Sequence, residues 1–246
     1  MNAEEYETLA QVEDTHWWYR GLRAMLRQAW HTDGLREDAA LLDVGCGTGA
    51  TLAAFDRLAT RIGLDVYPLA TATATCARRG LRCLVQGAAQ QLPFPGETFD
   101  AVFLMDVLYH RGVPNKVDAL REVERVLKPG GTVYVNVPAY QWLYSSHDRA
   151  IHTDRRFTRR ELVSMLNEAK LQTVRATYWN ALLLPPIVLV RLWRKWRPRQ
   201  GSDLTDNGDG IVTNLYTAGL AVERLLLRAI PLPAGLSIFA VARKAL

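Results

Sequence analysis

The sequence predicts an α/β fold in which a mostly parallel sheet is covered by helices. Two observations carry this prediction. Short apolar runs alternate with segments whose apolar residues recur at helical spacing, an alternation that is typical of βαβ units. One run also ends directly in a glycine-rich turn, as a strand does where it reaches the ligand-binding edge of such a sheet.

The expected elements follow one another regularly along most of the chain. The expected strands are 40–44, 61–65, 81–86, 99–106, 132–137, 172–178 and 236–243, and the expected helices include two within 2–30, then 48–58 and 114–127. Thr158, with Glu161 three residues later, predicts a capping box that begins a helix ending near Glu168. Residues 139–157 read as a long loop.

We expect one domain that spans residues 1–246 and has four parts. These are an N-terminal helical cap (1–35), the α/β core (36–179), a helical insertion or lid (180–230) and the final strand (231–246). The cap and the insertion should lie over the carboxyl ends of the strands. Residues 203–214 resemble a calcium loop only superficially, because the glutamate that would complete it is missing.

Charge and cysteine content narrow the classes of partner. The net charge is +5, with basic residues concentrated at 155–160 and 191–199 rather than along a stripe interleaved with aromatic residues. We therefore expect no nucleic-acid partner. Cys46, Cys76 and Cys83 have no disulfide or metal spacing, and the first ten residues are polar and acidic, so we expect a cytoplasmic protein with reduced thiols. No signal for an oligomeric state is present.

The strongest motif is the run L-L-D-V-G-C-G-T-G over residues 41–49. Its alternating glycines, Gly45, Gly47 and Gly49, allow positive φ and a close approach of the backbone to a ligand. Asp43 lies two residues before the first glycine, which argues against a pyrophosphate and for a cationic or hydroxyl-bearing ligand. Asp65, at the end of the next expected strand, can accept hydrogen bonds from both hydroxyls of a ribose.

Four motifs in this order resemble those of class I methyltransferases that depend on S-adenosylmethionine (SAM), in particular types 11 and 12. The further motifs are L-P-F-P at 92–95 with Phe99-Asp100, D-V-L-Y-H at 106–110, and the segment 122–131 that ends in K-P-G-G. The resemblance covers about residues 40–137. It implies a Rossmann-like sheet of seven strands, mostly parallel with the last strand antiparallel, and SAM as the cofactor.

The resemblance also implies which residues bind the cofactor. Asp43 and the three glycines would surround the methionine part of SAM, while Asp65 and Val66 would hold the ribose and adenine. The remaining predicted cofactor contacts are Cys46, Ala88, Ala89, Asp106 and Val107. Ala88 stands where the family often has an aspartate that meets the adenine amino group, so backbone groups or Gln90 must replace it.

The N-terminal run H-W-W-Y-R-G at 16–21 is similar to that of a narrower bacterial branch of these enzymes. Trp17 and Trp18 are either core anchors or an aromatic pair that closes over the cofactor. In the second case Trp18 contacts SAM and Arg20 pairs with its carboxylate.

Methyl transfer to a hydroxyl group requires a general base, and histidine is the usual one. The candidates are His110, after the fourth strand, and His147 and His152, in the loop that also holds Asp148 and Asp154. The alternative is that these histidines are bonded locally on the surface. We expect no metal site, because their spacing matches no standard metal motif.

The sequence therefore predicts a SAM-dependent methyltransferase that acts on oxygen in a small or medium biosynthetic acceptor with an apolar part. Transfer to nitrogen or to a carboxylate are the alternatives within this class. Outside it stand an NAD-dependent oxidoreductase and a non-catalytic SAM-binding protein at a membrane. The membrane alternative rests on segment 181–199, which is apolar and basic and could make weak contact with a membrane surface. Packing against the core or as part of the lid is the more common role of such a segment.

Overall fold

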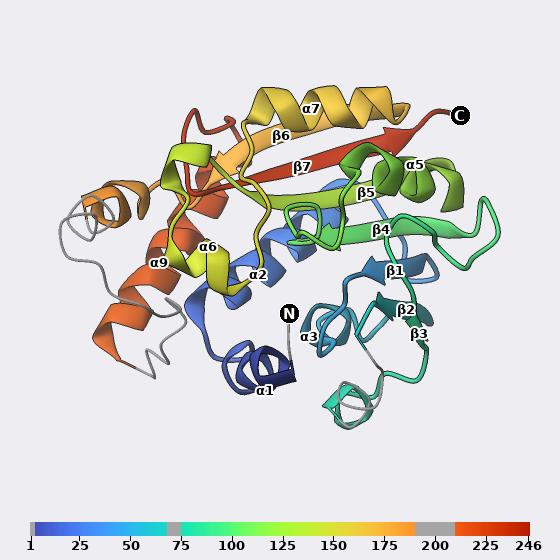
Figure 1. The fold of residues 1–246 in the computed structure, drawn as a ribbon, viewed down its shortest axis with the longest axis horizontal. Helices are drawn as coiled ribbons and strands as arrows, with labels where there is room; N and C mark the ends of the chain where they lie inside the picture. The colour runs from blue at the N-terminus through green and yellow to red at the C-terminus, as the bar shows by residue number, and fades with distance from the viewer. Residues whose placement is uncertain (1–2, 68–74, 190–209) are drawn as a thin grey trace.

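The computed structural model describes residues 3–67, 75–189 and 210–246, which form a seven-stranded sheet with helices on both faces (Figure 1). The strand order is β3-β2-β1-β4-β5-β7-β6. The strands are β1 (Ala40–Val44), β2 (Thr60–Asp65), β3 (Leu84–Gln86), β4 (Phe99–Met105), β5 (Leu127–Pro138), β6 (Leu171–Trp179) and β7 (Ser237–Lys244). The first five pair in parallel, and β7 is antiparallel to both β5 and β6. The predicted fold class is confirmed.

Each face of the sheet has its own apolar layer of helices (Figure 1). The helices α5 (Lys116–Val126) and α7 (Arg159–Glu168) cover one face, packing on side chains such as Leu42 and Val102. The helices α2 (Trp17–Thr32) and α3 (Ala50–Ala53) cover the other face, against side chains such as Leu41 and Phe103. Because both faces are buried, the central strands are apolar at nearly every position, as the sequence showed.

The two N-terminal helices have different positions. The first, α1 (Ala3–Val12), lies at the carboxyl ends of the strands, where its Tyr6 meets Asp65. The second, α2, runs along a face of the sheet, and Asp33 at its end accepts hydrogen bonds from the Tyr134 hydroxyl (2.8 Å) and from both terminal nitrogens of Arg175 (2.8 Å each). We expected both N-terminal helices to lie over the carboxyl ends of the strands. Of α2, only the amino end does so.

Several boundaries differ from the sequence prediction. The helix expected over 48–58 is only the four residues of α3, followed by turns, and the strand expected over 81–86 is only β3. The strand expected over 132–137 begins earlier, at Leu127, because the K-P-G-G run continues in extended form. Its register shifts against β4 between Phe99 and Ala101. The capping box of Thr158 and Glu161 is confirmed.

The chain between β6 and β7 carries two helical pieces among the described residues. These are residues 184–189 and α9 (Ile211–Leu226), which packs on α2. No helix in the described ranges is both long and apolar enough to cross a membrane. The basic segment 191–199 and most of the run 203–214 lie outside the described residues. The loop 139–157 contains two short helices, η1 (Gln141–Leu143) and α6 (Ser146–Ala150).

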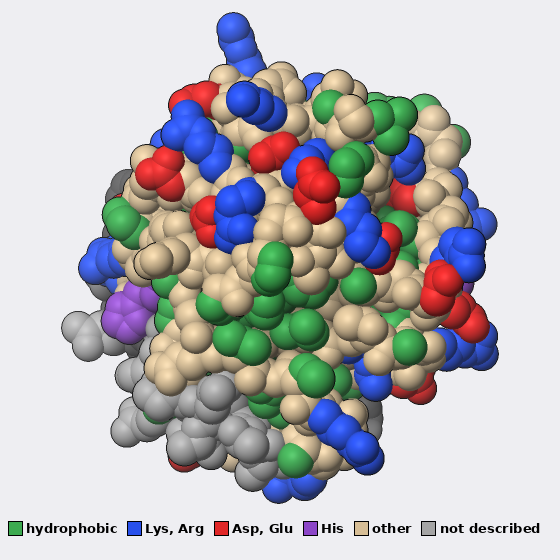
Figure 2. Space-filling model, turned by 90° about the vertical axis from the view of Figure 1, so that its right-hand side faces the viewer, with side chains coloured by type: hydrophobic (Ala, Val, Ile, Leu, Met, Phe, Trp, Pro, Cys, Tyr) green, Lys and Arg blue, Asp and Glu red, His purple; other side chains and the backbone are tan. Residues whose placement is uncertain are grey.

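Charges of both signs are intermixed over the upper part of the surface shown in Figure 2. Ion pairs on the molecule's exterior include Arg36 with Asp38 (2.6 Å) and Lys128 with Asp100 (2.8 Å). Mixed charge of this kind keeps a surface soluble without attracting a partner of one sign. In an open α/β sheet, ligands bind at the carboxyl ends of the strands.

Candidate functional site

A cavity of about 950 Å³ opens where the parallel strands end. Asp43 and Asp65 reach it from the ends of β1 and β2, and Asp106 reaches it from the residue after β4. Pro138 and Ser237 line it from β5 and β7. Because the carboxyl ends of parallel strands meet at one edge, residues far apart in the sequence gather here.

The glycine-rich turn after β1 forms one wall and can be built only from glycine. Gly45, Gly47 and Gly49 have φ of 77°, 54° and 84°, which side chains rarely adopt. A Cβ on Gly45 would lie 2.3 Å from the Cγ2 atom of Val107, and one on Gly49 would lie 2.3 Å from a side-chain methyl group of Leu81. Gly45, Cys46, Gly47 and Val107 line the cavity, whereas Gly49 does not; it is the left-handed residue before α3.

Asp65 is the best-bonded acid of the site. Its Oδ2 accepts the backbone N–H of Gly47 (2.8 Å), and its Oδ1 accepts the Tyr6 hydroxyl (2.6 Å) and the N–H of Tyr67 (3.0 Å). The Tyr6 ring stacks on Tyr67 at 4.3 Å. A ligand hydroxyl that binds Asp65 therefore competes with the Tyr6 hydroxyl.

Asp43 is almost fully buried behind Asp65, with 2% of its surface exposed. Burial, and then the charge of Asp65, hold the pKa of Asp43 well above its ordinary value. A cation brought beside these two carboxyl groups would favour their charged forms. The pair is thus suited to a positively charged ligand.

A buried polar cluster ties the turn between α1 and α2 to the glycine motif. The Glu13 carboxylate accepts hydrogen bonds from the Thr48 hydroxyl and from Arg79, and Arg79 also donates to the Thr48 carbonyl oxygen (2.8 Å). Arg79 pairs with Asp14 as well (2.7 Å). Helical periodicity carries no signal for this cluster, since Glu13 looks like a solvated acid at a helix end.

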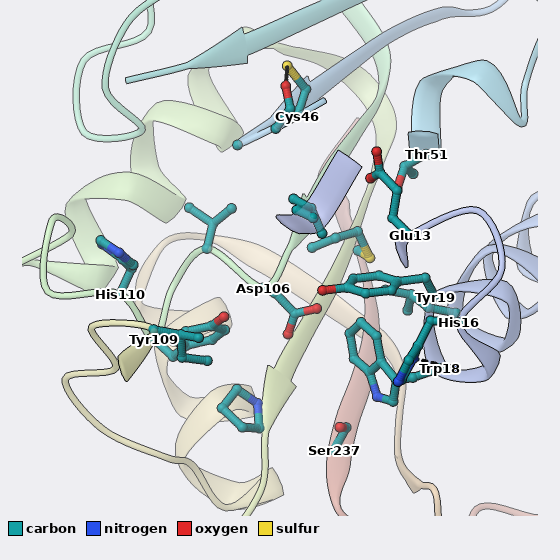
Figure 3. Close-up of a pocket in the computed structure, with 18 of the residues that line it drawn as sticks. Glu13, His16, Trp18, Tyr19, Cys46, Thr51, Asp106, Tyr109, His110 and Ser237 are labelled. Carbon is teal, nitrogen blue, oxygen red and sulfur yellow. Dashed lines mark hydrogen bonds between the residues drawn. The ribbon is translucent and has the colours of Figure 1, made fainter. Parts of the chain in front are cut away.

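Asp106 lies at the centre of the cavity view, with the Tyr19 hydroxyl directed toward it and Tyr109 on its other side (Figure 3). Its φ is 58°, so the backbone is held in the left-handed region at this point. Asn136 Nδ2 donates to Asp106 Oδ1 (3.0 Å), and Asn136 Oδ1 accepts from Trp179 Nε1 (2.8 Å). The indole N–H thereby fixes which side of the Asn136 amide faces Asp106.

The protein environment of Asp106 raises the pKa of its carboxyl group. Burial raises the pKa of Asp106 to about 7, against a smaller opposing effect of the hydrogen bond from Asn136. A carboxyl group of this strength exchanges its proton near neutral pH. The cofactor contact predicted at this position is therefore also a group able to perform acid–base chemistry.

The three candidate histidines do not share one position. His110 and His147 line the cavity, whereas His152 does not. His110 Nδ1 accepts the N–H of Gly112 (3.0 Å), which leaves Nε2 as its other nitrogen. The backbone at His152 has φ of 56°, its carbonyl oxygen accepts the N–H of Arg111 (3.1 Å), and its ring packs edge-on against the His110 ring at 6.0 Å without lining the cavity.

The loop 139–157, which carries His147 and His152, is held by a buried ion pair. Arg156 donates to both carboxylate oxygens of Asp148, at 2.7 and 3.1 Å, and to the Ala139 carbonyl oxygen at 3.2 Å. Both charged residues are at least 94% buried and both line the cavity. A bidentate pair of this kind is rigid, so it gives this part of the wall a defined shape.

The N-terminal run H-W-W-Y-R-G reaches the cavity, but not through Arg20. His16, Trp17, Trp18 and Tyr19 line it, while Arg20 is exposed on the outer side of α2 and does not. Four residues after Tyr19, on the same side of the helix, Arg23 lines the cavity and donates to the Glu13 carbonyl oxygen (2.8 Å). The helical spacing was the signal that could have identified Arg23.

The expected adenine region is lined by Val66, Ala89 and Gln90, whereas Ala88 does not reach the cavity. Gln90 Nε2 donates to the Gly112 carbonyl oxygen (2.8 Å). Its Oε1 is buried and has no hydrogen-bond partner among the described residues. A buried acceptor without a partner is costly unless a ligand donor satisfies it.

Tyr109 lines the cavity, whereas Tyr140, Trp142 and Tyr178 do not. Tyr140 stacks on Tyr178 at 5.1 Å and on Trp142 at 5.7 Å, so these rings pack on one another. No cluster of three or more potential metal ligands was found in the described ranges.

The comparisons with known proteins agree with this geometry. Residues 42–135 match the family described as a methyltransferase domain. This segment, which runs from β1 into β5 of the Rossmann-like sheet, is thus similar to a methyltransferase domain.

Two curated relatives match about half of the chain or less. Sterol 24-C-methyltransferase erg-4 of Neurospora crassa is 35% identical over 131 residues, which cover 49% of this chain and 33% of that protein. The ubiquinone/menaquinone biosynthesis C-methyltransferase UbiE of Hahella chejuensis is 38% identical over 113 residues, covering 42% of this chain and 44% of that protein. The matched segment thus spans less than half the length of each relative.

Solved structures resemble the chain over nearly its whole length. The [4+2]-cyclase SpnF aligns with a TM-score of 0.62 at 21% identity, covering 93% of this chain and 83% of that one. A SAM-dependent methyltransferase from Methanosarcina mazei aligns with a TM-score of 0.56 at 20% identity, covering 88% and 97%. At such identities the likeness concerns the fold, and the first name shows that the fold alone does not define the reaction.

The raised pKa of Asp106 predicts a pH-dependent penalty on stability. Between pH 4 and 7 the unfolded chain loses the Asp106 proton while the folded chain keeps it, so the free energy of unfolding falls by up to about 1.4 kcal/mol per pH unit from this group. Asp106→Asn removes this term. The melting temperature of the variant relative to the parent should therefore increase from pH 5 to about pH 7 and level off above it, where the folded chain also loses the proton. A difference that stays constant over this range would contradict the raised pKa.

Proposed function

We propose that this chain transfers a methyl group from SAM to an oxygen atom of a small or medium biosynthetic acceptor with an apolar part. The observation that carries the proposal is the acidic cavity beside the glycine-rich turn. Carboxyl groups of Asp43, Asp65 and Asp106 face it, whereas the carboxylates of Glu13 and Asp148 are paired with Arg79 and Arg156. SAM carries an ammonium, a sulfonium and a ribose, whereas the pyrophosphate of NAD would bring negative charge to the same wall.

The residues present fit SAM in three respects. The hydroxyl groups of a ribose would replace the Tyr6 hydroxyl as hydrogen-bond donors to Asp65. The adenine amino group would donate to the unpartnered Oε1 of Gln90, which takes over the role of the aspartate missing at Ala88. Arg23, rather than Arg20, would pair with the carboxylate of the methionine part.

Asp106 is the proposed general base. SAM supplies a methyl group on a sulfonium, and its transfer to a hydroxyl oxygen releases the hydroxyl proton. Asp106 takes this proton, the Asn136 amide holds the carboxylate in place, and the surrounding rings of Trp18, Tyr19 and Tyr109 exclude water. A base with a pKa near 7 is suited to this task at neutral pH. His110 and His147, which share the cavity, are the alternative bases.

The wall on the side of residues 183–187 supports an acceptor with an apolar part. Leu183, Pro186 and Ile187 line the cavity there, together with Tyr216 of α9 and Leu22 of α2. We propose that the described parts of residues 1–35 and 180–230 that reach the cavity, namely α1, the amino end of α2, residues 183–187 and α9, act together as a cap that shapes this acceptor region.

Transfer to carbon is the second candidate within the same class, because the curated relatives are named C-methyltransferases. Asp106 would then accept a proton from carbon instead of oxygen. The proton and carbon NMR spectra of the product distinguish the two, since the methyl group bonded to oxygen resonates apart from one bonded to carbon.

Arg23→Ala should weaken SAM binding by about ten-fold or more, because it removes a charge-assisted hydrogen bond to a carboxylate. Arg20→Ala removes the same charge from the outer side of the same helix and should leave the affinity unchanged. Isothermal titration calorimetry of both variants checks the assignment. Equal losses, or a loss confined to Arg20→Ala, would reject it.

Asp106→Asn should lower the turnover number by about 10²-fold or more and leave the dissociation constant for SAM within a few-fold of the parent value. Turnover by the parent should rise with pH up to about 7, following deprotonation of Asp106. Release of S-adenosylhomocysteine with a panel of apolar hydroxylated acceptors is the measurement. His152→Ala is the matched control, because its ring does not line the cavity. If His110→Ala or His147→Ala abolishes turnover while Asp106→Asn does not, that histidine is the base.

A further inference from the structure

The outer side of α9 is apolar, although it faces solvent. Leu215, Val222 and Leu226 are spaced by seven and four residues, which puts them on one side of the helix, and Leu225 adjoins them. Their exposed fractions are 64%, 54%, 48% and 57%. Leu182 (55%) and Ile230 (58%) extend this apolar surface, and we name these six residues the outer face. A surface helix normally shows polar residues to solvent, so the pattern of α9 is reversed.

The orientation of α9 is held by contacts on its opposite side. Glu223 is 2% exposed, and its Oε2 accepts the N–H groups of Ala181 (2.8 Å) and Leu182 (3.4 Å). Leu220 is buried beside Gly21 of α2, and the Tyr216 ring meets Trp17 at 5.2 Å. Rotating the helix to bury the outer face would break these contacts, so the exposure belongs to the fold.

The same two segments form a wall of the cavity. Leu183, Pro186 and Ile187 line the cavity from the segment that carries Leu182, and Tyr216 lines it from α9. These two segments therefore have apolar side chains both toward the cavity and toward the exterior. An apolar molecule dissolved in whatever covers the outer face would reach the cavity after a short path.

Within the described segment 210–236, the charges that are not buried are of one sign. Residues 210–236 contain three charged residues, Glu223, Arg224 and Arg228, of which the acid is buried. An apolar surface flanked by arginines is what anionic lipid headgroups attract. We propose that the outer face docks on the surface of a bilayer that contains anionic lipid. That the bilayer also delivers the acceptor rests in addition on the proposed function.

A second copy of this chain fits the outer face less well. In a symmetric dimer the same patch meets itself, which would bring Arg224 and Arg228 of one copy toward those of the other. Like charges across a desolvated interface are unfavourable. A bilayer with anionic headgroups instead offers these arginines partners of opposite sign.

Vesicle flotation of the full chain tests the proposal without reference to activity. The vesicles contain phosphatidylcholine alone or phosphatidylcholine mixed with phosphatidylglycerol. The test variant is Leu215→Glu with Val222→Glu. The control is Val174→Glu with Trp142→Glu, which adds the same charge at side chains that are 49% and 58% exposed elsewhere on the molecule. Thermal melting confirms that both double variants fold.

The parent and the control should float with the mixed vesicles and not with phosphatidylcholine alone. The test variant should bind the mixed vesicles about ten-fold or more weakly, because two apolar side chains no longer enter the headgroup region. Absence of the parent from the mixed vesicles, or equal binding by both double variants, would overturn the proposal. A parent that is dimeric by light scattering, with a monomeric test variant, would assign the outer face to a second copy instead.

Discussion

The gathering of carboxyl groups at one edge of the sheet is the constraint on which the rest of the site depends. Asp43 and Asp65 come from neighbouring parallel strands and face one cavity, and Asp106 joins them from the strand on the other side of β1. Burial and the neighbouring charge of Asp65 raise the pKa of Asp43, and burial raises the pKa of Asp106, so these two carboxyl groups are costly to ionise. A ligand that brings positive charge and hydroxyl donors relieves this cost, whereas one that brings phosphate increases it.

The N-terminal helices are organised around the same acids. The Tyr6 hydroxyl bonds Asp65, and Glu13 bonds Thr48 within the glycine-rich motif, so α1 and the start of α2 are attached to the cofactor edge by polar contacts. The rest of α2 packs on the sheet and against α9. Movement of α1 during binding would therefore break a small number of hydrogen bonds while leaving the apolar core of α2 in place.

The sheet and its edge could be predicted because both rest on local patterns, namely apolar runs and the alternating glycines 45, 47 and 49. The side chains that complete the site could not, because they depend on which side of a helix faces inward. Arg20 and Arg23 are both arginines of one helix, and only packing separates the exposed one from the one that lines the cavity. His152 was predicted from its residue type alone, and it does not line the cavity. Gln90 could be identified only because Ala88 stands where the family often has an aspartate.

Titration calorimetry of the purified chain with SAM and, separately, with NAD tests the central claim most directly. Saturable binding of SAM, weakened about ten-fold or more by Asp65→Ala, with no heat of binding for NAD, is the predicted result. Saturable binding of NAD by a chain that does not bind SAM would contradict the claim that this acidic edge is built for a cationic nucleoside without phosphate.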